Sequence, residues 1–181
     1  ITTSSVEVLA GLMAKMEAVI HIVGIIIEKG TAGFEAVHTE GTRRIVEAAK
    51  RAGVKRFVHM SALGAREGAA ARYHRTKFAA EEIVRESGLD WTIFRPSVIF
   101  GEGDAFLNTF AGIARRSPLL PVIGSGQGKL QPIWVEDVCR CFVRALDRSE
   151  TAGHTYELGG DKTYALESLL RMVARAMGKR R

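Results

Sequence analysis

Residues 34–60, FEAVHTEGTRRIVEAAKRAGVKRFVHM, join a predicted helix to a predicted strand and decide the fold class. From Phe34 to Ala52, apolar or small side chains recur every three or four residues, which is the spacing of one face of an α-helix. Gly53 follows this stretch, and glycine is typical just after the end of a helix. Residues 55–60, KRFVHM, then predict a short strand.

The same alternation continues in both directions along the chain. The expected helices are 5–16, 34–52, 72–87, 105–115, 136–147 and 165–177. The expected strands are 18–23, 55–60, 91–95, 130–135 and 155–158. Strands that alternate with helices imply right-handed crossovers and a parallel sheet. We therefore predict the α/β class, with 1–181 as a single domain, 1–103 as its sheet core and 104–181 as a small interleaved C-terminal lobe.

Composition excludes several classes of protein. The formal net charge is +6 over 181 residues, but no basic run is interleaved with aromatic residues, which argues against nucleic-acid binding. The longest apolar run, 18–27, contains His21 and is about half of what a membrane span needs. Cys139 and Cys141 are too few ligands for structural zinc, and the five histidines show no metal-binding spacing. We expect no metal site and a cytoplasmic location, where thiols stay reduced.

The strongest chemical signal is Y-x-x-x-K, formed by Tyr73 and Lys77 on the predicted helix 72–87. A spacing of four places both side chains on one helix face, one turn apart. A nearby ammonium favours the phenolate, so we expect Lys77 to lower the pKa of Tyr73 toward a value useful for proton transfer. The alternative is that Lys77 extends from a half-buried face to solvent while Tyr73 only packs.

Four further stretches resemble the short-chain dehydrogenases/reductases, in their extended, epimerase/dehydratase-like branches. Together with the Y-x-x-x-K motif they follow one another in the order found in that family. They are VIHIVG (19–24), EGTRRIVEAAKRAGVKRFVHMSA (40–62), RPSVIFGEGD (95–104) and LQPIWVEDV (130–138). A closer likeness is to the bacterial relatives of the nucleotide-binding accessory subunit of respiratory complex I. It is carried by YHRTKFAAEE (73–82), RPSVIFGEGDAFLNTFA (95–111) and QPIWVEDV (131–138). The resemblance implies a Rossmann-type, doubly wound parallel sheet with a substrate-side lobe.

The resemblance also implies roles for individual residues. Tyr73 would be the general acid/base, Lys77 would support it and bind the nicotinamide ribose, and Ser61 would polarise the substrate oxygen. The cofactor, NAD or NADP, would contact His21, Val23, Gly24, Tyr73, Lys77, Pro96, Ser97 and Val98. The substrate would be a small molecule with a hydroxyl or carbonyl group.

Three features depart from the family pattern. No glycine-rich dinucleotide fingerprint follows a strand, so we expect the fold to begin upstream, with roughly 60 residues preceding this stretch. The spacing from Ser61 to Tyr73 is shorter than in the extended enzymes of the family. The alternative to a catalytic role is that Ser61 caps the loop after its strand. His38 stands where extended relatives carry an asparagine that supports the lysine through water, and the alternative is a surface histidine.

Other polar and aromatic residues have simpler interpretations. We expect Asp137 to help start a helix, Asp104 and Glu102 to form a turn, and Trp134 and Phe142 to pack in the core. Three further side chains could line a substrate pocket or pack helices, namely Phe100, Phe106 and Asn108.

Two functions stay open at this point. One is an NAD(P)-dependent oxidoreductase or epimerase/dehydratase, and the other is a dinucleotide-binding subunit that turns nothing over. Helices 34–52 and 72–87 could pair in a homodimer, and the basic residues 179–181 could support association with a membrane. The protein could also dock to a membrane-bound complex, at the inner membrane.

Overall fold

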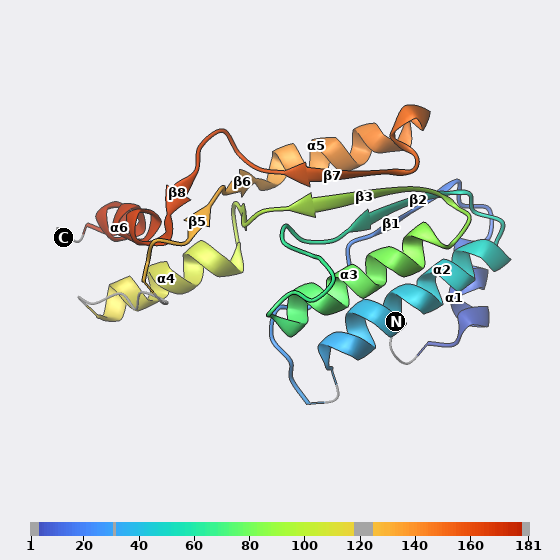
Figure 1. The fold of residues 1–181 in the computed structure, drawn as a ribbon, viewed down its shortest axis with the longest axis horizontal. Helices are drawn as coiled ribbons and strands as arrows, with labels where there is room; N and C mark the ends of the chain where they lie inside the picture. Colours follow the sequence, from blue (N-terminus) through green and yellow to red (C-terminus); the bar gives the residue numbers. More distant parts are fainter. Residues whose placement is uncertain (1–3, 31, 118–124, 179–181) are drawn as a thin grey trace. The chain divides into compact units, whose positions relative to one another are not determined.

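The computed structural model describes residues 4–30, 32–117 and 125–178 (Figure 1). The chain divides into two compact units, one of Ile1–Arg95 with Arg140–Glu157 and one of Pro96–Cys139 with Leu158–Arg181. The basic residues 179–181 lie outside the described residues, and so do residues 118–124, the first part of the Pro/Gly-rich stretch 118–129. The prediction of one domain divided at residue 103 stays a prediction.

A four-stranded sheet forms the centre of the first unit. Its strands lie in the order β1 (Ala18–His21), β2 (Arg56–Met60), β3 (Asp90–Pro96) and β7 (His154–Leu158). The β1–β2 and β2–β3 pairs are parallel, with Val19 opposite Phe57 and Phe57 opposite Trp91. This topology confirms the predicted α/β class with a parallel sheet. The first strand ends at His21, two residues earlier than expected.

Helices α1 (Val6–Met13), α2 (Gly41–Arg51) and α3 (Arg72–Arg85) lie together on one side of this sheet (Figure 1). On α2, Ala48 and Ala49 are fully buried, and these small side chains let the helix approach its neighbours closely. They join Phe57, Ile93 and other apolar side chains in one core cluster. Burying each large apolar side chain stabilises the fold by about 1.5–3 kcal/mol.

The predicted helix 34–52 is not α-helical throughout, because its first part is a π-helix, η1 (Glu35–Glu40). In this segment Thr39 donates a hydrogen bond to the Thr76 carbonyl, and His38 pairs with the Thr76 hydroxyl. The wider π turn therefore coincides with side-chain contacts to α3. Short π segments occur often at functional sites.

Helix α5 (Val135–Leu146) spans the boundary between the units. Its part in the first unit packs Phe142 against Phe94 of β3, with ring centroids 4.8 Å apart. Phe142 is buried, which confirms its predicted core packing. Arg56 of β2 donates to the Ala145 carbonyl, so a side-chain hydrogen bond also joins α5 to the sheet.

In the part of the chain that the structure describes, the second unit contains two short sheets, two whole helices and the first residues of α5. Strands β4 (Ile99–Phe100) and β6 (Ile133–Trp134) pair in parallel, and β5 (Lys129–Leu130) and β8 (Tyr164–Ala165) pair antiparallel. The single strand predicted at 130–135 is wrong, because Pro132 has no N–H to donate and divides it into β5 and β6.

Helices α4 (Ala105–Arg116) and α6 (Leu166–Ala176) complete the second unit and contact each other. Asp104 is the N-cap of α4, and its carboxylate accepts from the Leu107 N–H at 2.6 Å. Asp137 lies in the first turn of α5, as expected. None of the described helices is both long enough and apolar enough to cross a membrane.

Candidate functional site

Lys77 is the most unusual charged residue of the first unit. Its side chain is only 3% exposed, although lysine is rarely buried. The Nζ atom donates a 2.6 Å hydrogen bond to the carbonyl of Met60, the last residue of β2. Lys77 therefore does not extend to solvent, and its ammonium lies at the carboxyl end of a parallel strand. Ligands bind at that end of such sheets.

Burial changes the proton affinity of this lysine. Removal of the ammonium from water lowers the pKa of Lys77 to about 8, and the Glu81 carboxylate one turn later opposes the shift. At neutral pH most Lys77 side chains keep their charge. A site that holds a positive charge against burial favours an anionic group nearby.

Tyr73 is half-buried among rings, with centroids 5.4 Å from His38, 5.8 Å from Phe34 and 5.2 Å from His74. Burial raises the pKa of Tyr73 above its ordinary value, because the phenolate loses its hydration. The expected lowering by Lys77 is therefore wrong for this structure, in which the ammonium binds the Met60 carbonyl. Tyr73 keeps its proton at neutral pH.

His38 is 1% exposed, so the surface alternative for this residue is wrong. Its Nδ1 lies 2.9 Å from the Thr76 hydroxyl, and its Nε2 lies 3.1 Å from the Ile25 nitrogen. The Thr76 hydroxyl also donates to the Tyr73 carbonyl at 3.0 Å. His38 Nε2 lies 3.0 Å from the Ile25 carbonyl oxygen as well, so which ring nitrogen donates depends on the tautomer. Burial, followed by the charge of Lys77, lowers the pKa of His38 to about 4.

Gly24 connects these two side chains. A Cβ atom added there would lie 3.5 Å from His38 Nε2 and 3.6 Å from Lys77 Nζ. Gly24 itself is exposed, while Val23 beside it is half-buried. The structure thus brings Gly24, His38 and Lys77 together at the end of β1.

His21 faces the interior of the first unit. Its Nε2 lies 3.1 Å from the Thr42 hydroxyl, and its ring stacks on His59 at 5.3 Å. Burial lowers the pKa of His21 to about 4, with smaller contributions from Lys77 and His38. His59 is fully buried, and neither of its ring nitrogens has a hydrogen-bond partner in the structure. Both rings are therefore neutral.

The Ser61 hydroxyl donates to the Glu81 carboxylate, so it neither caps a loop nor points toward solvent. Glu81 is fully buried and also accepts from Arg95 at 2.8 Å and Arg85 at 2.7 Å. Sequence reasoning missed Glu81. The available signal was its position four residues after Lys77, on the helix face that already carries Tyr73.

The remaining predicted cofactor residues lie at the start of the second unit. Pro96 is buried at the end of β3, the Ser97 N–H donates to the Leu158 carbonyl, and the Val98 carbonyl accepts from Ile133. Within the described residues, no group of three or more His, Cys, Asp or Glu side chains is placed to hold a metal ion.

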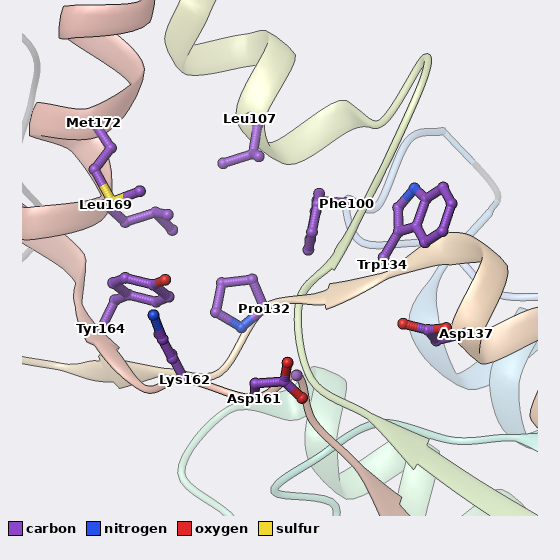
Figure 2. A pocket seen from close by; sticks show the side chains of 11 residues that line it. Phe100, Leu107, Pro132, Trp134, Asp137, Asp161, Lys162, Tyr164, Leu169 and Met172 are labelled. Atoms are coloured by element: carbon purple, nitrogen blue, oxygen red, sulfur yellow. The ribbon is translucent and has the colours of Figure 1, made fainter.

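The second unit has a pocket of about 520 Å³ (Figure 2). Its lining residues are Phe100, Leu107, Pro132, Trp134, Asp137, Gly160, Asp161, Lys162, Tyr164, Leu169 and Met172. Trp134 is 44% exposed, so its predicted core packing is wrong, because the ring lines this open pocket. Phe100 also lines it, whereas Phe106 packs on Phe110 and the Asn108 amide donates to the Asp104 carbonyl.

A sequence profile described as NAD(P)H-binding matches residues 1–107, which include β1–β3 and the Tyr73–Lys77 helix. The chain belongs to the NAD(P)H-binding family. Its fold is that of the extended, epimerase/dehydratase-like branch, as the sequence predicted. One solved structure with this fold is dTDP-glucose 4,6-dehydratase (DesIV) from Streptomyces venezuelae with NAD and TYD bound. It superposes with a TM-score of 0.81 at 21% identity, over 98% of this chain and 63% of that one.

One curated relative is a subunit of NADH dehydrogenase, and another is a reductase. Mitochondrial NADH dehydrogenase (ubiquinone) 1 alpha subcomplex subunit 9 of Arabidopsis thaliana is 35% identical over 90% of this chain and 41% of its own length. Ceramide reductase of Caulobacter vibrioides is 35% identical over 90% of this chain and 50% of its own length. The chain therefore spans about two-fifths to one-half of these relatives.

Proposed function

We propose that the protein reduces the carbonyl group of a small molecule, with Tyr73 as proton donor and Lys77 as the cation that supports it. The observation that carries this proposal is the buried Lys77 ammonium at the end of β2, one helical turn from a tyrosine that keeps its proton. Proton donation requires both the Lys77 ammonium and the protonated Tyr73 phenol.

The residues present fit a nicotinamide cofactor. Gly24 leaves the backbone open beside the Lys77 ammonium, and an ammonium at this edge of a parallel sheet suits the hydroxyls and phosphates of a dinucleotide. Gly24 and Lys77 would contact the cofactor, and NAD(P)H supplies the hydride when bound. Whether the cofactor is NAD or NADP is an outcome of the titrations below.

Tyr73 is suited to the reductive direction. Because burial raises its pKa, the phenol is present at neutral pH and can donate its proton to the oxygen of a carbonyl whose carbon receives hydride. The product is an alcohol and Tyr73 is left as a phenolate, which the Lys77 ammonium would stabilise only by exchanging its hydrogen bond to the Met60 carbonyl. Solvent then returns the proton to Tyr73.

The second candidate is a dinucleotide-binding subunit that does not catalyse a reaction. The Ser61 hydroxyl is engaged by Glu81, so it is not available to polarise a substrate oxygen, and this favours the second candidate. The Arabidopsis relative is named as a subunit of NADH dehydrogenase, and docking to such a complex at the inner membrane belongs to this alternative. The cytoplasmic location and the homodimer stay predictions.

The test combines binding with turnover. NADH and NADPH are titrated by fluorescence, and their oxidation is followed with a panel of aldehydes and ketones for the wild type, Tyr73→Phe and a control, Tyr156→Phe. Tyr156 lies on β7 in the same unit and is partly exposed. We expect Tyr73→Phe to bind cofactor normally and to lose turnover at least about a hundredfold, while the control retains it. Cofactor binding without turnover in any of the three proteins would support the second candidate instead.

A further inference from the structure

We infer that the pocket of the second unit binds the hydrocarbon chain of an amphiphilic molecule with an uncharged or cationic head group. The inference that the pocket binds an alkyl chain is drawn from the structure alone. We further infer that this amphiphile is the substrate, and that step rests on the function proposed above.

The walls of the pocket are mainly hydrocarbon. Apolar or aromatic side chains come from β4, α4, β6 and the residue before it, β8 and α6, and Figure 2 shows them around one shared space. They are Phe100, Leu107, Pro132, Trp134, Tyr164, Leu169 and Met172. A volume of about 520 Å³ lies within the usual range for small-molecule sites.

Two of these side chains are exposed in a way that a core would not allow. Met172 is 48% exposed and Trp134 is 44% exposed, while Leu169 beside Met172 on α6 is buried. Grouped exposed apolar surface marks an interaction site more often than isolated exposed residues do. Burial of this surface by a hydrocarbon chain would remove it from water at a gain of about 25 cal/mol per Å².

The polar lining identifies the head group. Asp161 and Lys162 follow β7 on the way to β8, and Asp137 lies at the start of α5. Among the described residues, the lining therefore contains two carboxylates, one ammonium and no arginine. Recognition of a diphosphate depends on cationic donors, above all arginine. This lining suits a hydroxyl, amide or ammonium head group better than a nucleoside diphosphate.

Gly160 holds the polar edge close to the apolar wall. A Cβ atom at this position would lie 2.1 Å from the Pro132 carbonyl oxygen, so only glycine fits without movement of the backbone. The Gln131 side chain also donates to the Gly160 carbonyl at 2.6 Å. The pocket is therefore a built feature of the second unit.

Trp134 is a natural reporter for this site, because the only other tryptophan is Trp91 on β3. In a Trp91→Phe protein, Trp134 fluorescence is followed during titration with 1-hexanol, 1-octanol and 1-decanol, and separately with UDP. We expect the alkanols to bind about fourfold more tightly for each added methylene, and UDP to leave the signal unchanged. Equal affinity along the alkanol series, or saturable binding of UDP alone, would overturn the inference.

Substitutions test whether the alkanols bind in this pocket. Met172→Asp places a charge on the exposed apolar wall, and we expect it to weaken 1-decanol binding about tenfold or more, while Met172→Leu preserves it. The matched control is Val143→Asp, because Val143 is an exposed apolar helical residue outside the pocket. Loss of binding in the control but not in Met172→Asp would contradict the assignment.

The same samples separate this inference from the proposed function. Chain-length-dependent alkanol binding in a protein that binds neither NADH nor NADPH would refute the proposed function and support the alkyl pocket. Nicotinamide binding and Tyr73-dependent turnover without any alkanol binding would support the function and refute the alkyl pocket.

Discussion

The two units of this protein carry different kinds of candidate site. In the first unit, charged and ring-nitrogen groups are buried against backbone carbonyls and hydroxyls, as Lys77 and His38 show. In the second unit, apolar side chains such as Trp134 and Met172 are left exposed around a pocket. Both arrangements cost stability, and both are typical of sites rather than of cores. The two proposals made above follow this contrast: proton transfer by Tyr73 for the first unit, and binding of an alkyl chain for the second.

Glu81 tests the first half of this contrast with the largest expected effect. Glu81→Ala removes the carboxylate shared by Ser61, Arg85 and Arg95, and leaves buried donors without an acceptor. We expect a loss of about 3 kcal/mol or more in the free energy of unfolding, measured with urea. The control is Glu82→Ala, whose carboxylate is half-exposed and pairs only at the surface with Arg85. Equal losses for the two variants would show that the buried cluster is unimportant.

The buried histidines predict a dependence of stability on pH. The pKa of His21 is about 4 in the folded protein, below its ordinary value near 6.5, because burial disfavours the imidazolium. The unfolded chain therefore binds more protons below pH 6.5, so stability falls as the pH drops from 6.5 toward 4. For His21 alone the loss approaches about 3 kcal/mol at the lower limit.

The measurement is the free energy of unfolding between pH 8 and pH 5 in the wild type and in His21→Asn. We expect a shallower decline below pH 6.5 in the variant, because one group that must stay neutral has been removed. Identical slopes in the two proteins would mean that His21 is accessible to protons in the folded state.

Gly160 tests the second unit with a smaller effect. In Gly160→Ala the new methyl group would meet the Pro132 carbonyl at 2.1 Å, so the backbone must move. We expect a loss of about 2 kcal/mol in the free energy of unfolding, together with weaker 1-decanol binding. Gly112→Ala on α4 is the control, because nothing lies within 4 Å of the added methyl group. That variant should gain about 0.5 kcal/mol, since alanine favours helix more than glycine does.

The spacing of apolar residues predicted the helices and strands that are long enough to show a regular pattern of their own. Apolar spacing placed α3 and the strand β3 within two residues of their ends, because each is long and buries a regular face. The two-residue strands β4 and β8 were not predicted, since they depend on partners about 35 residues away. The π-helix Glu35–Glu40 was missed because its apolar positions also suit an α-helix.

In the candidate site, too, only the residues that one helix carries could be predicted from their spacing in the sequence. The spacing of Tyr73 and Lys77 was visible because one helix carries both residues. Two partners of Glu81 come from outside its helix, since Ser61 follows β2 and Arg95 lies on β3. The exposure of Trp134 depends on the pocket around it. Neither feature could be predicted from local sequence. The sign of the Tyr73 pKa shift was wrong for a related reason, because burial is a property of the tertiary structure.

The most direct test of the central claim follows deuterium from the nicotinamide C4 position of labelled NADH or NADPH to a carbonyl acceptor, in wild type and in Tyr73→Phe. The account predicts a product alcohol with deuterium on the former carbonyl carbon in the wild type. It predicts at least about a hundredfold less product in Tyr73→Phe, with unchanged cofactor binding. Tight cofactor binding with no deuterium transfer in either protein, across aldehydes and ketones of every chain length tested, would contradict it and indicate a dinucleotide-binding subunit.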